Sequence, residues 1–171
     1  SSFTLCDCSG SGAGNGNITH ANDVTGRGVL VSSSDSKQAS FIMYGGKISG
    51  NHAGTALRGE DGAGVRVQNA SFKMYGGTIT DNTATKGGGG VYVSGGTFTM
   101  NGNASVTSNR ATDRDNGTGG VYVVDGTFTM NDNASITGNT ATSTDGGVGV
   151  YTTSTTATFT MHGGTISGNT A

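Results

Sequence analysis

A motif of Phe, any residue and Met recurs five times along the chain and constrains its fold more than any other feature. Every Met in the sequence lies two residues after a Phe, and successive Phe of the motif are 31, 26, 30 and 31 residues apart. A fixed internal period of this length is typical of a solenoid, in which each repeat forms one coil that packs against its neighbours. The repeated pairs are Phe41 and Met43, Phe72 and Met74, Phe98 and Met100, Phe128 and Met130, and Phe159 and Met161.

Each repeat carries two further elements at regular positions. A Val-x-Val segment precedes most of the Phe residues, and an Ile or Val follows each Phe, with an Asn three positions later. These short segments alternate between apolar and polar residues, which predicts strands, and the 33 Gly would weaken helices. The repeated Asn, which we interpret as structural, are Asn51, Asn82, Asn109, Asn139 and Asn169.

The pattern predicts an all-β fold, a parallel β-helix with three short strands per coil. Coils stacked about 4.8 Å apart would place equivalent side chains over one another, so the Phe, Met and Asn should form columns. We expect about five full coils in residues 29–171, as one continuous domain, and a degenerate N-terminal capping coil in residues 1–28. In that cap, Phe3 and Leu5 take the places of Phe and Met.

Composition argues against two classes of partner. Nine Lys and Arg against eleven Asp and Glu, with a net charge of −2, provide no positive field for nucleic acid. No apolar run approaches the roughly 18 residues that a membrane-spanning helix needs. We therefore expect neither nucleic-acid binding nor membrane insertion within this segment.

The run Phe-x-Met-x-Gly-Gly-Thr-Ile-Ser-Gly-Asn-Thr-Ala, followed by Gly-Gly-Val-Tyr-Val, resembles the right-handed parallel β-helix repeats of bacterial and archaeal adhesin-like surface proteins. The segments that start at Phe98 and Phe128 are also similar to the Phe-x-x-Asn repeat of polymorphic outer-membrane proteins. The resemblance implies a right-handed winding, a cell-surface or secreted location and a scaffold role. It implies no catalytic residue.

The outward position of the Val strand holds the candidate binding residues. Tyr92, Tyr122 and Tyr151 would form an exposed row that Arg66 continues, and exposed rings can contact sugars or anchor a partner protein. The alternative is that these rings only cover the sheet by packing across neighbouring strands. The first interpretation predicts that the module binds a glycan or a protein of a host or neighbouring cell.

Two other functions remain open. A polysaccharide lyase or glycosidase needs convergent acidic residues, yet the outward strand positions contain none, so we expect no enzyme and no cofactor. An ice-binding solenoid is the second alternative, because three successive repeats present Thr-x-Thr outward, although Thr is also a common strand residue. The Thr pairs are Thr97 and Thr99, Thr127 and Thr129, and Thr158 and Thr160.

The remaining polar motifs are weak. Asp113 and Asp115 superficially match the start of a calcium loop without its distal Glu, and we favour solvated turns at these positions over a calcium site. Cys6 and Cys8 are open to three interpretations: buried thiols, a strained disulfide, or a metal site with His20.

The last repeat runs directly to Ala171. We expect its coil to be covered by further repeats of the same polypeptide, or by end-to-end contact with another copy.

Overall fold

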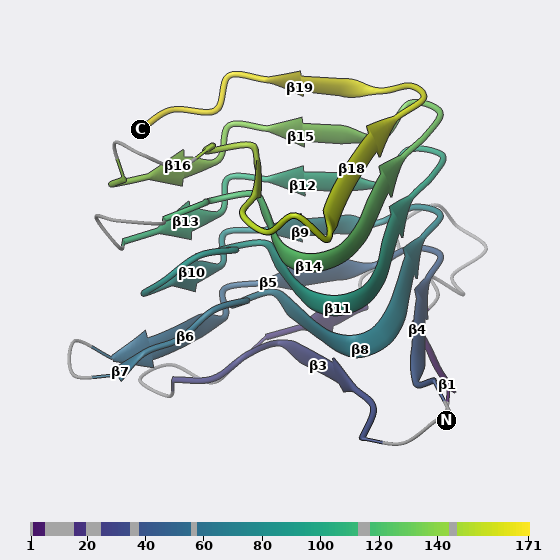
Figure 1. Ribbon diagram of the computed structural model, residues 1–171, viewed down its shortest axis with the longest axis horizontal. Helices are drawn as coiled ribbons and strands as arrows, with labels where there is room; N and C mark the ends of the chain where they lie inside the picture. Colours follow the sequence, from purple (N-terminus) through teal and green to yellow (C-terminus); the bar gives the residue numbers. More distant parts are fainter. Residues whose placement is uncertain are drawn as a thin grey trace.

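The computed structural model describes residues 2–5, 16–19, 25–34, 38–55, 58–112, 117–143 and 147–171. This part of the chain is all-β and winds into a solenoid whose successive coils pair as parallel strands in three sheets (Figure 1). Figure 1 shows the coils rising from the N-terminus to the C-terminus with a right-handed turn. The predicted fold class is confirmed.

The Val-x-Val and Phe-x-Met segments form one bent strand in the middle coils, where the sequence pattern predicts two strands. In β11 (Val91–Met100) the bend falls at Gly95 and Gly96. Their φ values of 79° and 90° turn the chain without ending the strand. Only the outer coils keep the two segments separate. The sheet contains β1 (Ser2–Leu5), β3 (Val29–Ser32), β4 (Ser40–Met43), β8 (Val65–Met74), β11 (Val91–Met100), β14 (Val121–Met130), β17 (Val150–Thr152) and β18 (Ala157–Met161).

The second sheet carries the Ile and Val residues that precede the repeated Asn, as predicted. Its strands pair in register, so Ile48 lies beside Ile79 and Val106 beside Ile136. The strands are β2 (Asn17–Ile18), β5 (Lys47–Ser49), β9 (Thr78–Thr80), β12 (Ser105–Thr107), β15 (Ser135–Thr137) and β19 (Thr165–Ser167).

A third sheet follows the Asn positions, where the sequence pattern predicts only loops. Its short strands and the chain that returns from them form an arm at the left of Figure 1, with a small separate core of Ala53, Ala63 and Ala84. Such segments escape prediction because they contain no large apolar residue. The strands are β6 (His52–Thr55), β7 (Arg58–Gly59), β10 (Thr83–Ala84), β13 (Arg110–Ala111) and β16 (Thr140–Ala141).

Among the described residues, four turns have strands on all three faces, one fewer than the five expected. The last turn has β17, β18 and β19, but its third strand is reduced to a single bridge between Thr140 and Thr170. At the other end, β1 and β2 form an N-terminal coil that lies before the first complete turn. Among the described residues this coil has no strand that pairs with β3 or β6.

The core is built from columns that run along the solenoid axis. The rings of the Phe column, which begins at Phe3 and contains all five repeated Phe, lie 4.8–5.3 Å apart with interplanar angles of 10–18°. Beside it, Met74, Met100 and Met130 are fully buried. Such stacked rings fill the interior of every coil while leaving each ring dependent on its two neighbours.

The five repeated Asn form the predicted ladder. The Asn82 side chain shows the pattern: its Nδ2 donates to Ile48 O at 3.0 Å and to Asn109 Oδ1 at 2.9 Å. The backbone N–H of Asn82 donates to the same Asn109 oxygen at 3.1 Å. Because Asn82 and Asn109 are fully buried, these bonds satisfy amides that would otherwise be costly to remove from water.

Candidate binding surface

The outward side chains of β11, β14 and β18 form a threonine face of six residues, Thr97, Thr99, Thr127, Thr129, Thr158 and Thr160. Parallel pairing keeps them in register, with Thr97 beside Thr127 and Thr127 beside Thr158. The Thr97 hydroxyl also donates to Ser71 Oγ at 3.2 Å in the preceding coil. The result is a regular array of hydroxyl and methyl groups about 4.8 Å apart along the axis.

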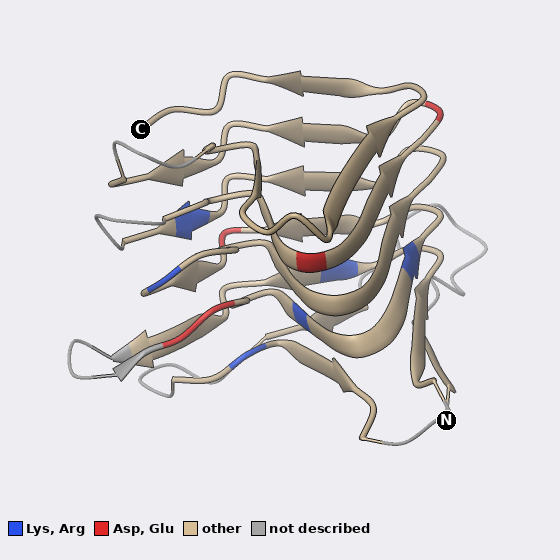
Figure 2. Cartoon of the chain, in the orientation of Figure 1, with Lys and Arg blue, Asp and Glu red and all other residues tan. Residues whose placement is uncertain are grey.

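Charged side chains are distributed unevenly along the solenoid (Figure 2). Most of the described Lys, Arg, Asp and Glu lie in the coils below β11, including Lys73 in the same outward column as Thr99. Among the described residues beyond β11, the charged ones are Arg110, Asp125 and Asp132. None of these belongs to the threonine face, so this surface is polar without carrying charge.

The predicted exposure of the tyrosine row is wrong for two of its members. Tyr92 and Tyr122 are only 8% and 9% exposed. The arm covers them, because a side chain at Gly87 would run into the Tyr122 ring and one at Gly88 would lie 2.9 Å from the Tyr92 Cβ. Tyr151 is partly exposed, and its role as a contact residue remains a prediction.

The row nevertheless forms a column, as its register predicts. Tyr92 and Tyr122 pack edge to face with centroids 5.5 Å apart, and Tyr122 stacks on Tyr151 at 5.3 Å. The Arg66 guanidinium lies 4.8 Å from the centre of the Tyr92 ring, which is a cation–π contact. These contacts fit the alternative interpretation, in which the rings cover the sheet.

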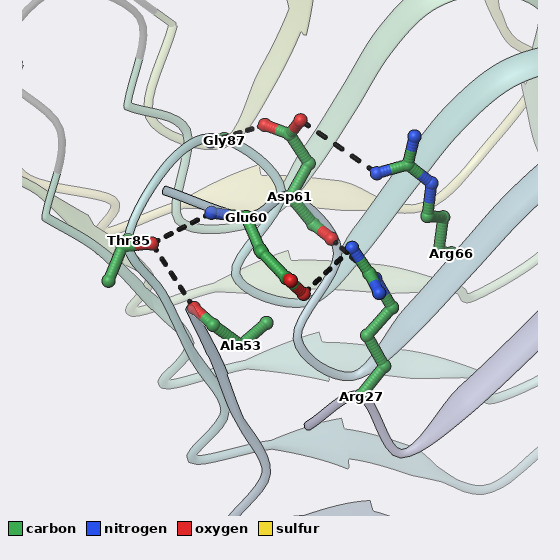
Figure 3. Close-up of polar contacts among 7 residues, drawn as sticks. All are labelled: Arg27, Ala53, Glu60, Asp61, Arg66, Thr85 and Gly87. Atoms are coloured by element: carbon green, nitrogen blue, oxygen red, sulfur yellow. Dashed lines mark hydrogen bonds and ion pairs between the residues drawn. The ribbon is translucent and has the colours of Figure 1, made fainter. Parts of the chain in front are cut away.

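A cluster of charged residues ties the arms of neighbouring coils together (Figure 3). Arg27 Nη2 lies 2.9 Å from Glu60 Oε2, and Arg27 Nε donates to the Asp61 carbonyl at 3.0 Å. On the opposite side, Asp61 Oδ1 accepts the Gly87 N–H at 3.0 Å, and its other oxygen lies 3.9 Å from Arg66 Nη1. Both carboxylates therefore contact a guanidinium group, a geometry that suits a structural tie between coils.

Burial changes the acidity of two groups at this cluster. It raises the pKa of the Asp61 carboxyl above the ordinary value of 3.8, against the opposing effects of the Gly87 N–H and the positive charge of Arg66. It also raises the pKa of the Tyr92 phenol above 10.0, and the charge of Asp61 adds to this effect. The cluster thus holds an aspartate whose ionised form is disfavoured in the fold.

The most exposed tyrosines among the described residues lie elsewhere, at the corner that follows Met43 and Met74. Tyr44 and Tyr75 are 55% and 44% exposed and stack with centroids 5.1 Å apart. In the next coils this column continues with Asn101 and Asn131, joined by a hydrogen bond from Asn131 Nδ2 to Asn101 Oδ1 of 2.9 Å. The position after Met in each repeat is the sequence feature that locates this column.

The described residues contain no group of three or more His, Cys, Asp or Glu that could hold a metal ion. The candidates Asp113, Asp115, Cys6, Cys8 and His20 lie outside them. Within the same part of the chain, no helix has the length and apolar character that crossing a membrane requires. No family model, curated protein or solved structure matches the chain.

Proposed function

We propose that the chain is a non-catalytic module of an extracellular or cell-surface protein, acting as a rigid scaffold or adhesin that binds a glycan or a protein. The observation that carries this proposal is the set of unbroken columns, because stacked rings and the Asn ladder link every coil to the next. Such a stack resists bending and holds its outer faces in fixed register. The resemblance to adhesin-like repeats supports the proposed location.

The threonine face is the proposed contact surface, in place of the buried tyrosines. Its hydroxyls can donate and accept hydrogen bonds, and its methyl groups provide apolar contact. An uncharged polysaccharide suits it best, because such a chain offers matching hydroxyls and binding it requires no charged group to lose water.

Binding to immobilised uncharged polysaccharides and to a glycan array tests the proposal. We expect the wild-type chain to bind and the double variant Thr99→Lys, Thr129→Lys to lose binding. The control is Thr107→Lys, Thr137→Lys, which changes a pair on the second sheet that is also half-buried and should leave binding intact. Absence of wild-type binding, or equal binding by both double variants, would contradict the proposal.

Ice binding is a second candidate for the same surface, favoured by the in-register array of Thr hydroxyl and methyl groups. Thermal hysteresis of the wild-type chain that disappears in the Thr99→Lys, Thr129→Lys variant would support it. If a solution of the wild-type chain freezes and melts at the same temperature, the ice-binding hypothesis is wrong.

A further inference from the structure

We propose that Tyr44 and Tyr75 form an oxidative cross-linking site, at which a peroxidase-type oxidant with hydrogen peroxide joins two neighbouring coils by a covalent bond between the rings. The site lies on the side of the solenoid, at the corner where β4 and β8 end. This inference rests on the fold and does not depend on the proposed ligand.

Parallel pairing holds the two tyrosines at equivalent positions of adjacent coils. Met43 pairs with Met74, and the Tyr75 N–H donates to Met43 O at 2.8 Å. Beyond the corner, the Thr78 N–H donates to Gly46 O at 3.0 Å. The backbone is therefore fixed on both sides of the pair, and the rings stack with centroids 5.1 Å apart and planes at 13°.

Exposure distinguishes this pair from the other tyrosine contacts. Tyr44 and Tyr75 are both about half exposed, whereas Tyr92 and Tyr122, which pack edge to face, are both buried. In the contact of Tyr122 with Tyr151, one of the two rings is buried. These contacts involve all five Tyr of the chain. An oxidant in solution can therefore reach both partners of a tyrosine pair only at the corner.

The reaction at this site is an oxidation by two electrons. Each phenol loses one electron and one proton and becomes a phenoxyl radical, and these electrons and protons reduce one hydrogen peroxide to two waters. The radicals then form a carbon–carbon bond between ring carbons next to the hydroxyl groups. The hydrogens displaced from these carbons return to the two oxygens, so the chain loses two hydrogen atoms in total.

The surroundings of the pair direct the radicals to each other. The rings are already in contact, so coupling within one chain needs only a rotation of two exposed side chains from stacked into edge contact. The adjacent Met43 and Met74 are fully buried, which protects their sulfur atoms from the oxidant. Asn101 takes the equivalent position in the next coil, where its N–H donates to Met74 O at 2.8 Å. The cross-link therefore does not extend to that coil.

Treatment of the dilute wild-type chain with a peroxidase and hydrogen peroxide tests the inference. We expect one main product within single chains, lighter by two hydrogen atoms and with dityrosine fluorescence. Mass spectrometry of a proteolytic digest should find the link between Tyr44 and Tyr75. The variants Tyr44→Phe and Tyr75→Phe should each lose this product, because each keeps the ring and removes the hydroxyl group that the oxidant attacks.

Matched controls come from the buried tyrosines. Tyr92→Phe and Tyr122→Phe remove the same hydroxyl group and should give the wild-type yield, and melting followed by circular dichroism checks that every variant is folded. Oxidation of the wild-type chain in urea should lose the preference for this pair, since the fold no longer aligns the rings. A folded wild-type chain without the cross-link would overturn the inference, and so would a main product that joins Tyr122 to Tyr151 or an unchanged preference in urea.

Discussion

At the scale of single residues, the Asn ladder shows how one amide joins three coils. Asn109 Oδ1 accepts two hydrogen bonds from Asn82, while Asn109 Nδ2 donates to Ile79 O and to Asn139 Oδ1. The spacing in the sequence predicts the position of each Asn. It does not predict the donor pattern, which depends on the side chain pointing along the axis instead of outward.

Asn109→Ala should destabilise the fold by about 3–5 kcal/mol, because the buried Asn82 backbone N–H and one N–H of its side chain lose their acceptor, and the Ile79 carbonyl loses the hydrogen bond from Asn109 Nδ2. Asn51→Ala should be less damaging, since Asn51 Oδ1 has no hydrogen-bond partner among the described residues. Urea denaturation measures both losses, and the exposed Asn103→Ala serves as a control with little expected change. Equal losses at Asn109 and Asn51 would show that the ladder bonds do not set stability.

The raised pKa of Asp61 should make the free energy of unfolding depend on pH. Its pKa is raised in the folded state above the ordinary 3.8, so the fold binds this proton more tightly than the unfolded chain does. The contribution of Asp61 is therefore most favourable below pH 3.8 and is lost as the pH rises through the folded-state pKa.

Asp61→Asn removes the buried charge and leaves an oxygen that can accept the Gly87 N–H. We expect this variant to be more stable than wild type at neutral pH, with the difference shrinking as the pH falls towards 3.8. Denaturation curves across this range measure it, with the exposed Asp125→Asn as control. A loss of stability at neutral pH would mean that the contact with Arg66 outweighs the effect of burial.

At the scale of elements, large apolar residues made the strands predictable. The positions of Phe, Met, Ile and Val in the sequence indicate which side chains point inward, and in the structure these side chains form the buried core. The arm strands contain only small or polar residues, so the sequence pattern does not predict them. The pattern also predicts a turn at Gly95 and Gly96, because it does not show that strand pairing continues through this corner. For the same reason the sequence predicts the register of the tyrosines but not the glycine-rich arm that covers Tyr92 and Tyr122.

Phe98→Ala tests the Phe column as an element. The ring is fully buried and stacks at 4.9 Å on both Phe72 and Phe128, so its removal leaves a cavity that neither neighbour can fill. We expect a loss of about 3–5 kcal/mol in the free energy of unfolding. Phe3→Ala, at a ring that is 54% exposed, should cost much less in the same assay. Similar losses at both sites would indicate that the column relaxes around the gap.

At the scale of the whole molecule, stability should vary along the axis. Among the described residues, a middle coil packs against two neighbours, whereas β17, β18 and β19 each pair on one side. Amide hydrogen exchange should therefore be slowest in β8, β11 and β14 and fastest in the outermost coils of this chain. Uniform exchange throughout would show that the solenoid opens as a single unit.

The recurrence of the same contacts at every coil boundary has a consequence for how such a chain can change its length. Because the core columns of Phe, of Ile or Val and of Asn meet equivalent partners above and below, duplicating or deleting one repeat of the gene preserves these core contacts at the remaining boundaries. We expect unequal recombination to alter the reach of the molecule in increments of about 4.8 Å without requiring compensating substitutions.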